Sequence, residues 1–129
     1  MTKAQAYYSF MSSFGIPAYE QSAVPQGGSA PVFPYLTYSL YIDSFGTDSP
    51  VEVNLWYRDK SGYSSLPDLT RMVEKISAEI GRGGKMIPCD GGALWLRRGS
   101  PFAQLLGDGE DELIKRAYIN ITAESITAD

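Results

Sequence analysis

Apolar and polar residues alternate with a period of two over residues 33–42 and again over residues 51–58. This is the period of a β-strand with one buried face. In the first segment, one face carries Leu36, Tyr38, Leu40 and Ile42, and the other carries Tyr35, Thr37, Ser39 and Tyr41. In the second, one face carries Val51, Val53, Leu55 and Tyr57, and the other carries Glu52, Asn54, Trp56 and Arg58. The turn-rich segment 43–50 between them predicts an antiparallel hairpin.

The C-terminal half predicts further strands. Residues 85–98 indicate two short strands around the Asp-Gly-Gly turn at 90–92, which is a strong hairpin signal. Residues 99–112 are expected to form a loop or a single helical turn. Residues 113–125 alternate again, with Ala117, Ile119, Ile121 and Ala123 on one face and Tyr118, Asn120 and Thr122 on the other. A short edge strand is also expected over residues 19–24, before a Pro/Gly loop at residues 25–31.

Two segments have the period of an amphipathic helix. Residues 3–14 place Tyr7, Phe10, Met11 and Phe14 on one face, and Gly15 follows as a stop signal. Residues 65–80 bury a stripe formed by Leu66, Leu69, Met72, Val73, Ile76 and Ile80. Ser65 with Asp68 resembles a capping box, Pro67 stands in the first turn, and Gly81 ends the helix.

The order of these elements predicts one α+β domain over residues 1–129. We expect a mainly antiparallel, mixed sheet of about four to six strands with two helices packed on one face. The other face is then rich in aromatic and uncharged polar side chains: Tyr35, Thr37, Ser39, Tyr41, Asn54, Trp56, Tyr118, Asn120 and Thr122. Tyr and Trp are enriched, and charges depleted, where one protein buries the surface of another. The pattern therefore predicts extensive contact with other chains.

The composition of the chain limits which kinds of binding and catalytic site it can contain. The chain of 129 residues has a net charge of −4, one cysteine and no histidine. The acidic balance counts against sequence-specific nucleic-acid binding, and the lack of histidine removes the commonest acid–base group and metal ligand. A single cysteine cannot form an internal disulfide, and no apolar run approaches the roughly 18–20 residues of a bilayer span. We expect a cytoplasmically assembled protein without a signal peptide, cofactor or metal.

Three local motifs have features of a binding or catalytic site. The glycine-rich run at 81–86 lacks the spacing of a phosphate-binding loop and is better explained as a helix end with a turn. Cys89 has no histidine to activate it, and a small core or turn residue is the default reading. The acidic cluster at 107–112 lacks the ligand spacing of a calcium loop and is read as a solvated turn. No nucleophile context is recognisable, so we expect no enzyme.

Several stretches together resemble a known family. Residues 15–25 (GIPAYEQSAVP), 33–40 (FPYLTYSL), 51–58 (VEVNLWYR), 87–101 (IPCDGGALWLRRGSP) and 114–124 (IKRAYINITAE) are similar to small proteins of the morphogenesis modules of tailed bacteriophages and prophages. Members are described as minor capsid or tail-completion proteins. The resemblance covers nearly the whole chain, and the second and fourth stretches are its most specific parts.

The resemblance implies a tail terminator, or tail-to-head joining protein. Such proteins form a homohexameric ring that caps the tail tube, docks to the head connector and lets DNA pass without sequence-specific binding. It implies a virion location and no catalytic motif. A ring needs two different contact patches on each subunit. The candidates are residues of the Pro/Gly loop, the open face and a basic pair: Gln26, Gly27, Gly28, Ser29, Tyr35, Tyr41, Trp56, Tyr118, Arg97 and Arg98.

Three alternatives remain at this point. A head-completion or neck protein shares the module and the size. A cytoplasmic small-ligand-binding domain would enclose a pocket between the helices and the aromatic sheet face. Arg97 and Arg98 could join Lys115 and Arg116 in a basic patch if their strands are neighbours, or they could be ordinary surface charge. The loop at 25–31 is expected to change shape on assembly.

Overall fold

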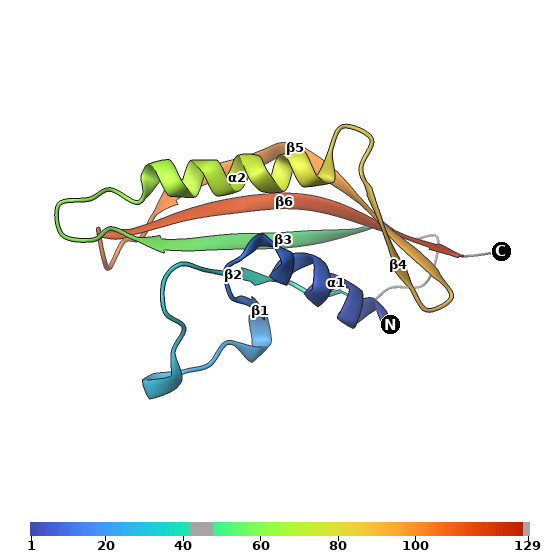
Figure 1. Cartoon of the computed structure of the whole chain (residues 1–129), viewed down its shortest axis with the longest axis horizontal. Coiled ribbons are helices and arrows are strands. Elements are labelled where there is room, and N and C mark those ends of the chain that lie inside the picture. Colours follow the sequence, from blue (N-terminus) through green and yellow to red (C-terminus); the bar gives the residue numbers. More distant parts are fainter. Residues whose placement is uncertain (42–47, 128–129) are drawn as a thin grey trace.

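A six-stranded mixed sheet with two helices on one face forms the described part of the chain, residues 1–41 and 48–127, in the computed structural model (Figure 1). The strand order in the sheet is β1-β2-β3-β6-β5-β4. The strands are β1 (Ala18–Glu20), β2 (Tyr35–Tyr38), β3 (Asp48–Arg58), β4 (Lys85–Cys89), β5 (Gly92–Gly107) and β6 (Ile114–Thr127). The α+β class, the one-sided helices and the mainly antiparallel pairing are confirmed.

Both helices begin and end close to the predicted positions. Helix α1 (Lys3–Met11) has a capping box between Thr2 and Gln5, and a short 3₁₀ turn (Ser12–Phe14) leads to Gly15 at φ 88°. Helix α2 (Leu66–Ile80) carries Pro67 in its first turn and ends at Gly81. The predicted capping box of Ser65 is wrong. The Ser65 side chain makes no cap bond, because its hydroxyl donates to Asp59 instead.

The strand β5 is much longer than predicted. Residues 99–107, expected as loop or helical turn, continue β5 along β6 after an irregularity between Arg98 and Ala103. A Cβ on Gly99 would lie 2.7 Å from the backbone oxygen of Asn120, so the irregular segment packs directly on β6. The glycine and proline residues at 99–101 indicated a loop, but pairing with β6 holds this segment as a bulged strand.

Strands β1 and β2 differ in detail from expectation. The structure confirms an edge strand but limits it to three residues, and a 3₁₀ turn follows at Gln21–Ala23. It pairs parallel to β2, which makes the sheet mixed. Strand β2 covers four residues, and it pairs antiparallel to β3 as predicted. Leu40 packs partly against the core, and the predicted position of Ile42 lies outside the described residues.

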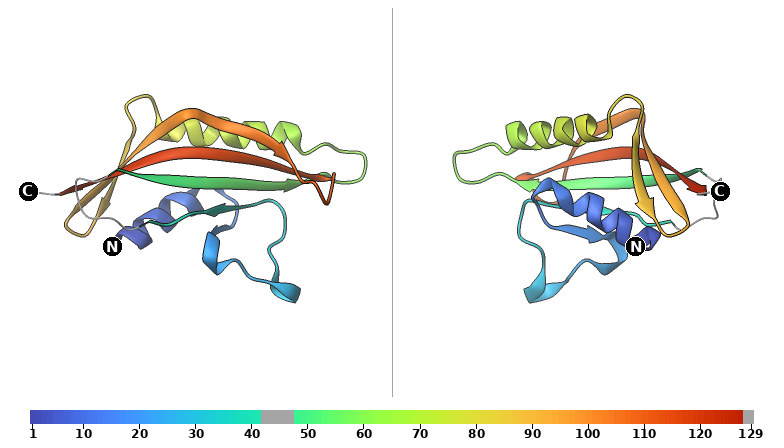
Figure 2. Two further views of the ribbon diagram at one scale, coloured as in Figure 1. Left: turned by 180° about the vertical axis from the view of Figure 1, so that it is seen from behind. Right: turned by 45° about the vertical axis from the view of Figure 1, so that its right-hand side comes forward.

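The core lies between the helices and the facing side of the sheet. The alternating residues predicted to face inward do so: Leu36, Tyr38, Val51, Val53, Leu55, Tyr57, Ala117, Ile119, Ile121 and Ala123 are buried. Helix α1 adds Tyr7, Phe10 and Met11, and α2 adds Leu69, Ile76 and Ile80. The view from behind shows the strands in front of both helices (Figure 2, left). One face of the sheet is therefore left without a covering helix.

A candidate interaction face on the open side of the sheet

The face without helices carries five of the ten predicted contact residues, namely Tyr35, Tyr41, Trp56, Tyr118 and Arg97. Register places Tyr35 opposite Trp56, Thr37 opposite Asn54, and Asn54 opposite Tyr118. Tyr35 and Trp56 are half-buried by one another and by their neighbours. The three strands β2, β3 and β6 thus bring together aromatic side chains that stand far apart in the sequence, as the two-residue period predicted.

Four side chains form a continuous row across four strands, and we call Tyr19, Tyr35, Trp56 and Arg116 the aromatic row. The Tyr35 and Trp56 rings stack with centroids 6.2 Å apart and planes 15° apart. Tyr19 meets Tyr35 edge-on at 6.1 Å, and the Arg116 guanidinium lies over the Trp56 ring at 5.3 Å from its centroid. Phe33 packs beside Tyr35 with centroids 5.3 Å apart.

The Trp56 side chain at the centre of the aromatic row already has its contacts and its hydrogen bond within the protein. Trp56 contacts Tyr35 from β2 on one side and Arg116 from β6 on the other, and its indole N–H donates to the Thr37 hydroxyl at 3.0 Å. The ring faces are used within the protein, so little of them remains for stacking a base or a sugar ring. A fixed row of this kind suits contact with another protein surface, because few rotamers are lost on binding.

Tyr41 and Tyr118 extend the face beyond the row. The side chain of Tyr41 is 51 % exposed and lies close enough to Tyr118 for their hydroxyl groups to interact electrostatically. Burial, then the hydrogen bond to the Glu52 carboxylate, raises the pKa of Tyr118. Tyr118 therefore stays neutral at physiological pH. The Glu52 carboxylate beside it is already hydrogen-bonded, and the carboxylates of Asp48 and Glu124 farther along the same face lie within ion-pair distance of Arg97.

Of the two interpretations of the basic residues, the structure excludes a basic patch and favours ordinary surface charge. Arg97 lies on the open face, stacks on Trp95 at 4.4 Å and pairs with Asp48 at 3.0 Å. Arg98 points to the opposite face, where it donates to the Ser77 hydroxyl of α2 at 2.9 Å. The strands are neighbours, but the residues paired with Arg97 and Arg98 are Thr122 and Ile121, about 20 Å along β6 from the other two cations.

Lys115 and Arg116 also lie on opposite faces of the sheet. Lys115 lies on the helix side and pairs with Asp59 at 3.1 Å, whereas Arg116 lies on the open face against Trp56. Adjacent residues of a strand point to opposite faces, so two consecutive basic residues cannot share one patch. Among the described residues, Arg116 has no carboxylate within ion-pair distance.

The loop candidates lie away from the sheet. Gln26 precedes a 3₁₀ turn over Gly27–Ser29, and its side-chain amide donates to the Val24 carbonyl at 3.2 Å. Gly27 has φ 63°, which favours glycine at this position. The segment projects from the body of the domain below β1 in Figure 1. Its predicted change of shape on assembly stays a prediction.

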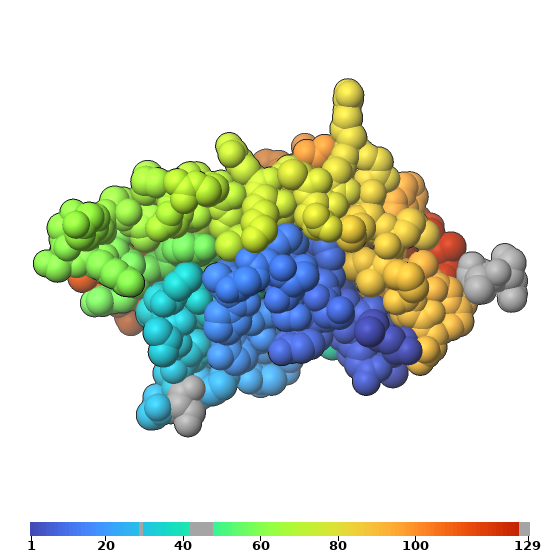
Figure 3. Space-filling view, in the orientation of Figure 1, coloured from blue at the N-terminus to red at the C-terminus, as the bar shows by residue number. Residues whose placement is uncertain are grey.

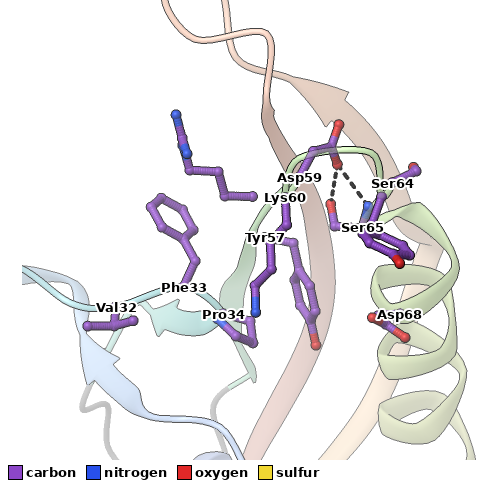
Figure 4. Close-up of a pocket in the computed structure, with 11 residues that line it drawn as sticks. Val32, Phe33, Pro34, Tyr57, Asp59, Lys60, Ser64, Ser65 and Asp68 are labelled. Carbon is purple, nitrogen blue, oxygen red and sulfur yellow. Dashed lines mark hydrogen bonds between the residues drawn. The ribbon is translucent and has the colours of Figure 1, made fainter.

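A cavity of about 330 Å³ lies at the C-terminal end of β3, on the side of the sheet that the helices cover. Figure 4 shows Phe33 and Pro34 on one side of it, Tyr57 in the middle and the start of α2 on the other. Asp59 accepts hydrogen bonds from the Ser65 N–H at 2.8 Å and the Ser65 hydroxyl at 2.7 Å. These bonds tie the end of β3 to the first turn of α2.

The same hydrogen bonds predict a pH dependence. The backbone bond from Ser65, then its hydroxyl and Lys115, lower the pKa of Asp59 to about 2. An unfolded aspartate titrates near pH 3.9. The unfolded chain therefore binds this proton first, so the stabilisation is full above about pH 4 and is lost as the pH falls towards 2. We expect Asp59→Asn to be less stable than wild type at pH 6 and to approach it at pH 2.

Urea unfolding of both proteins between pH 2 and 6 measures this difference. Asp111 also has a lowered pKa, chiefly from the Leu113 N–H, but it is present in both proteins and cancels. A stability gap between wild type and Asp59→Asn that stays constant over this pH range would contradict the assignment.

The open face also includes two residues that the sequence patterns did not assign to it. Tyr19 was placed in an edge strand without a role, and Arg116 was considered as part of a basic patch or as ordinary surface charge. Both residues lie at alternate positions to buried residues, on strands next to β2 and β3, which places them on the open face. This pattern can be used only once the strand order is known.

Comparison with family models, with curated proteins and with solved structures found no match for this chain. Among the described residues, neither helix has the length and apolar character that a bilayer crossing requires.

Proposed function

We propose that this protein is a structural component of virion assembly, with no enzymatic role, that caps a phage tail tube as a homo-oligomeric ring and joins the tail to the head connector. The aromatic row on an uncovered sheet face carries this proposal. A row of fixed aromatic side chains, flanked by neutral hydroxyl and amide groups, matches the composition of buried protein interfaces. The resemblance of the most specific sequence stretches to tail terminators supplies the biological setting.

The position of the helices favours contact with protein over enclosure of a ligand. Helices α1 and α2 cover one side of the sheet, and the aromatic row lies on the other (Figure 2). The two sets of side chains therefore do not enclose a pocket between them, as a small-ligand-binding domain of this kind would need. The partners proposed are further copies of this chain, the tail tube protein and the head connector, with DNA passing through the ring.

Substitution of Tyr41 by glutamate tests the proposal. Tyr41 is exposed and lies outside the stacked row, so a charge there should leave the subunit folded and place an unpaired carboxylate in the contact. A charge at Tyr35 would also block assembly, but it would disturb the Trp56 stack within the subunit as well. We therefore expect Tyr41→Glu to give folded subunits that form no ring.

The matched control is Tyr63→Glu, because Tyr63 is 78 % exposed and lies beside the cavity at the start of α2, away from the open face. Native mass spectrometry and electron microscopy with added tail tubes measure assembly. Wild type and Tyr63→Glu should form rings, free or at tube ends. Normal rings from Tyr41→Glu would overturn the interface. A wild-type protein that ignores tubes and binds connector-loaded heads would instead indicate a neck protein.

A further inference from the structure

We propose that the aromatic row of one subunit packs on the outer face of helix α1 of the next subunit. This inference rests on the proposed ring, and it names the two patches that meet. Each ring subunit must offer two different surfaces, of which the open sheet face provides one. The question is therefore which other surface of the domain is suited to being buried.

The outer face of α1 is hollowed, and the side chains that line the hollow are uncharged. A shallow depression of about 590 Å³ is lined by Met1, Ala4, Gln5, Tyr8, Ser9 and Ser12. Tyr8 is 54 % exposed, and Met1 is 58 % exposed. The space-filling view shows α1 (dark blue) accessible on the front of the molecule, below α2 (Figure 3). An exposed tyrosine and methionine around small residues form a surface into which projecting aromatic edges can pack.

The second helix has a different surface. The exposed positions of α2 include Arg71, Glu74, Lys75 and Glu79, which is the pattern of a helix facing water. On α1, Lys3 is the sole charged residue between the first and last helical positions. Burying the charges of α2 would cost desolvation, whereas the face of α1 carries almost none to desolvate.

Electrostatic repulsion between copies also favours contact between these two surfaces. Each copy carries a net charge of −4, so copies repel one another unless they meet where carboxylates are absent or neutralised. No carboxylate side chain lines the hollow of α1, and the amino terminus of Met1 at its edge is already neutralised by Asp90 at 2.6 Å. The aromatic row contributes the cation of Arg116. A second copy of this chain fits both descriptions, because the contact then sets a surface without carboxylate side chains against a row whose one charge, that of Arg116, is a cation already held over the Trp56 ring.

The two patches lie on opposite sides of the domain. Helix α1 is on the near side of the sheet in Figure 1, and the left view of Figure 2 shows the opposite face from behind. The aromatic row lies on that opposite face, because its residues alternate with the buried core residues. Patches on opposite sides cannot meet around a two-fold axis, since that symmetry brings a patch against itself. They meet front to back, and such heterologous contacts close into a ring when the rotation between neighbouring subunits closes, whereas without that rotation they continue as an open filament. The proposed ring requires the closing rotation.

Two lysine variants disable one patch each. Ser9→Lys places a cation in the α1 hollow, and Tyr19→Lys places one at the end of the row. Each variant alone should bind itself at least roughly tenfold more weakly than wild type, because every contact then contains a buried unpaired charge. An equal mixture retains one intact contact, between α1 of the Tyr19→Lys copy and the row of the Ser9→Lys copy. Native mass spectrometry should therefore show 1:1 heterodimers and no rings.

Ala78→Lys is the matched control, because it adds the same charge to the exposed face of α2 and should leave ring formation unchanged. Thermal unfolding checks that all three variants fold. A photo-reactive benzoylphenylalanine at position 9, in otherwise wild-type protein at tube ends, gives a second measurement. Cross-links to peptides containing Tyr19, Tyr35 or Trp56 support the contact, and cross-links to α1 of another copy overturn it.

The outcomes separate this inference from the proposed function. If Ser9→Lys forms rings like wild type while Tyr41→Glu does not, the α1 contact is wrong and the ring stands. A variant mixture without heterodimers also overturns the contact. If wild-type protein forms no ring in solution or at tube ends, the proposed function fails with it.

Discussion

Replacing Gly84 by alanine is expected to lower the free energy of unfolding by about 3 kcal/mol or more. Gly84 adopts φ 88°, a conformation that side chains with a Cβ rarely tolerate. An added Cβ would also lie 2.4 Å from Nε1 of Trp95 and 2.6 Å from the backbone oxygen of Leu96. The backbone contact cannot be relieved by rotating a side chain, so the turn between α2 and β4 must shift.

Gly83→Ala is the matched control for this prediction. Gly83 has no atom within 4 Å of the added Cβ and has no positive φ, and its carbonyl still accepts the Trp95 indole N–H. Urea unfolding should place Gly83→Ala within about 0.5 kcal/mol of wild type. Equal stability of the two alanine variants would show that the turn adjusts without cost.

Substitution of Ile119 by alanine should cost about 3 kcal/mol. Ile119 is fully buried at the centre of β6, where it pairs with Val53 on one side and Ala103 on the other. Removing three carbon atoms from this position leaves a cavity beneath the helices that neighbouring strands cannot fill, because both are held in register by β6.

Two further variants give the scale for this measurement. Ile119→Val removes one carbon atom and should cost about 1 kcal/mol. Leu105→Ala removes a side chain that is 48 % exposed on the neighbouring strand, and it should cost well under half as much as Ile119→Ala. An equal loss from Leu105→Ala and Ile119→Ala would mean that the core does not lie where the structure places it.

Most of the fold follows from local patterns. The two-residue alternation of β3 and β6 identified the buried face correctly, because a strand with one buried face must repeat every second residue. Helix α2 was recognisable from its apolar stripe, Pro67 and Gly81 for similar local reasons. The Asp-Gly turn between β4 and β5 was predicted from backbone preferences that act within four residues.

The errors in the fold come from contacts with residues outside the segment that was interpreted. Residues 99–107 form a strand because β6 pairs with them, although their own glycine and proline suggested a loop. Ser65 was predicted to cap α2, but Asp59, six residues earlier, accepts its hydroxyl hydrogen bond. In both cases a tertiary partner outweighs a local preference of about 1 kcal/mol.

The candidate interaction face was partly predictable. Alternation placed Tyr35, Trp56 and Tyr118 on the side opposite the buried residues, and this is where they lie. The same reasoning could not order the strands, so it missed that Tyr19 and Arg116 continue the row. It also grouped Arg97 with Arg98, although a strand sends consecutive side chains to opposite faces.

The sequence by itself determined which residues of each strand share a face, where α2 begins and ends, and that one sheet face is aromatic. These properties depend on backbone periodicity and on interactions within a few residues of the chain. Only the tertiary structure decided the strand order, the stacking of Tyr35 on Trp56 and Arg116, and the placement of α1 opposite that row. Pairing between strands depends on residues far apart in the sequence, and no local pattern encodes which strands become neighbours.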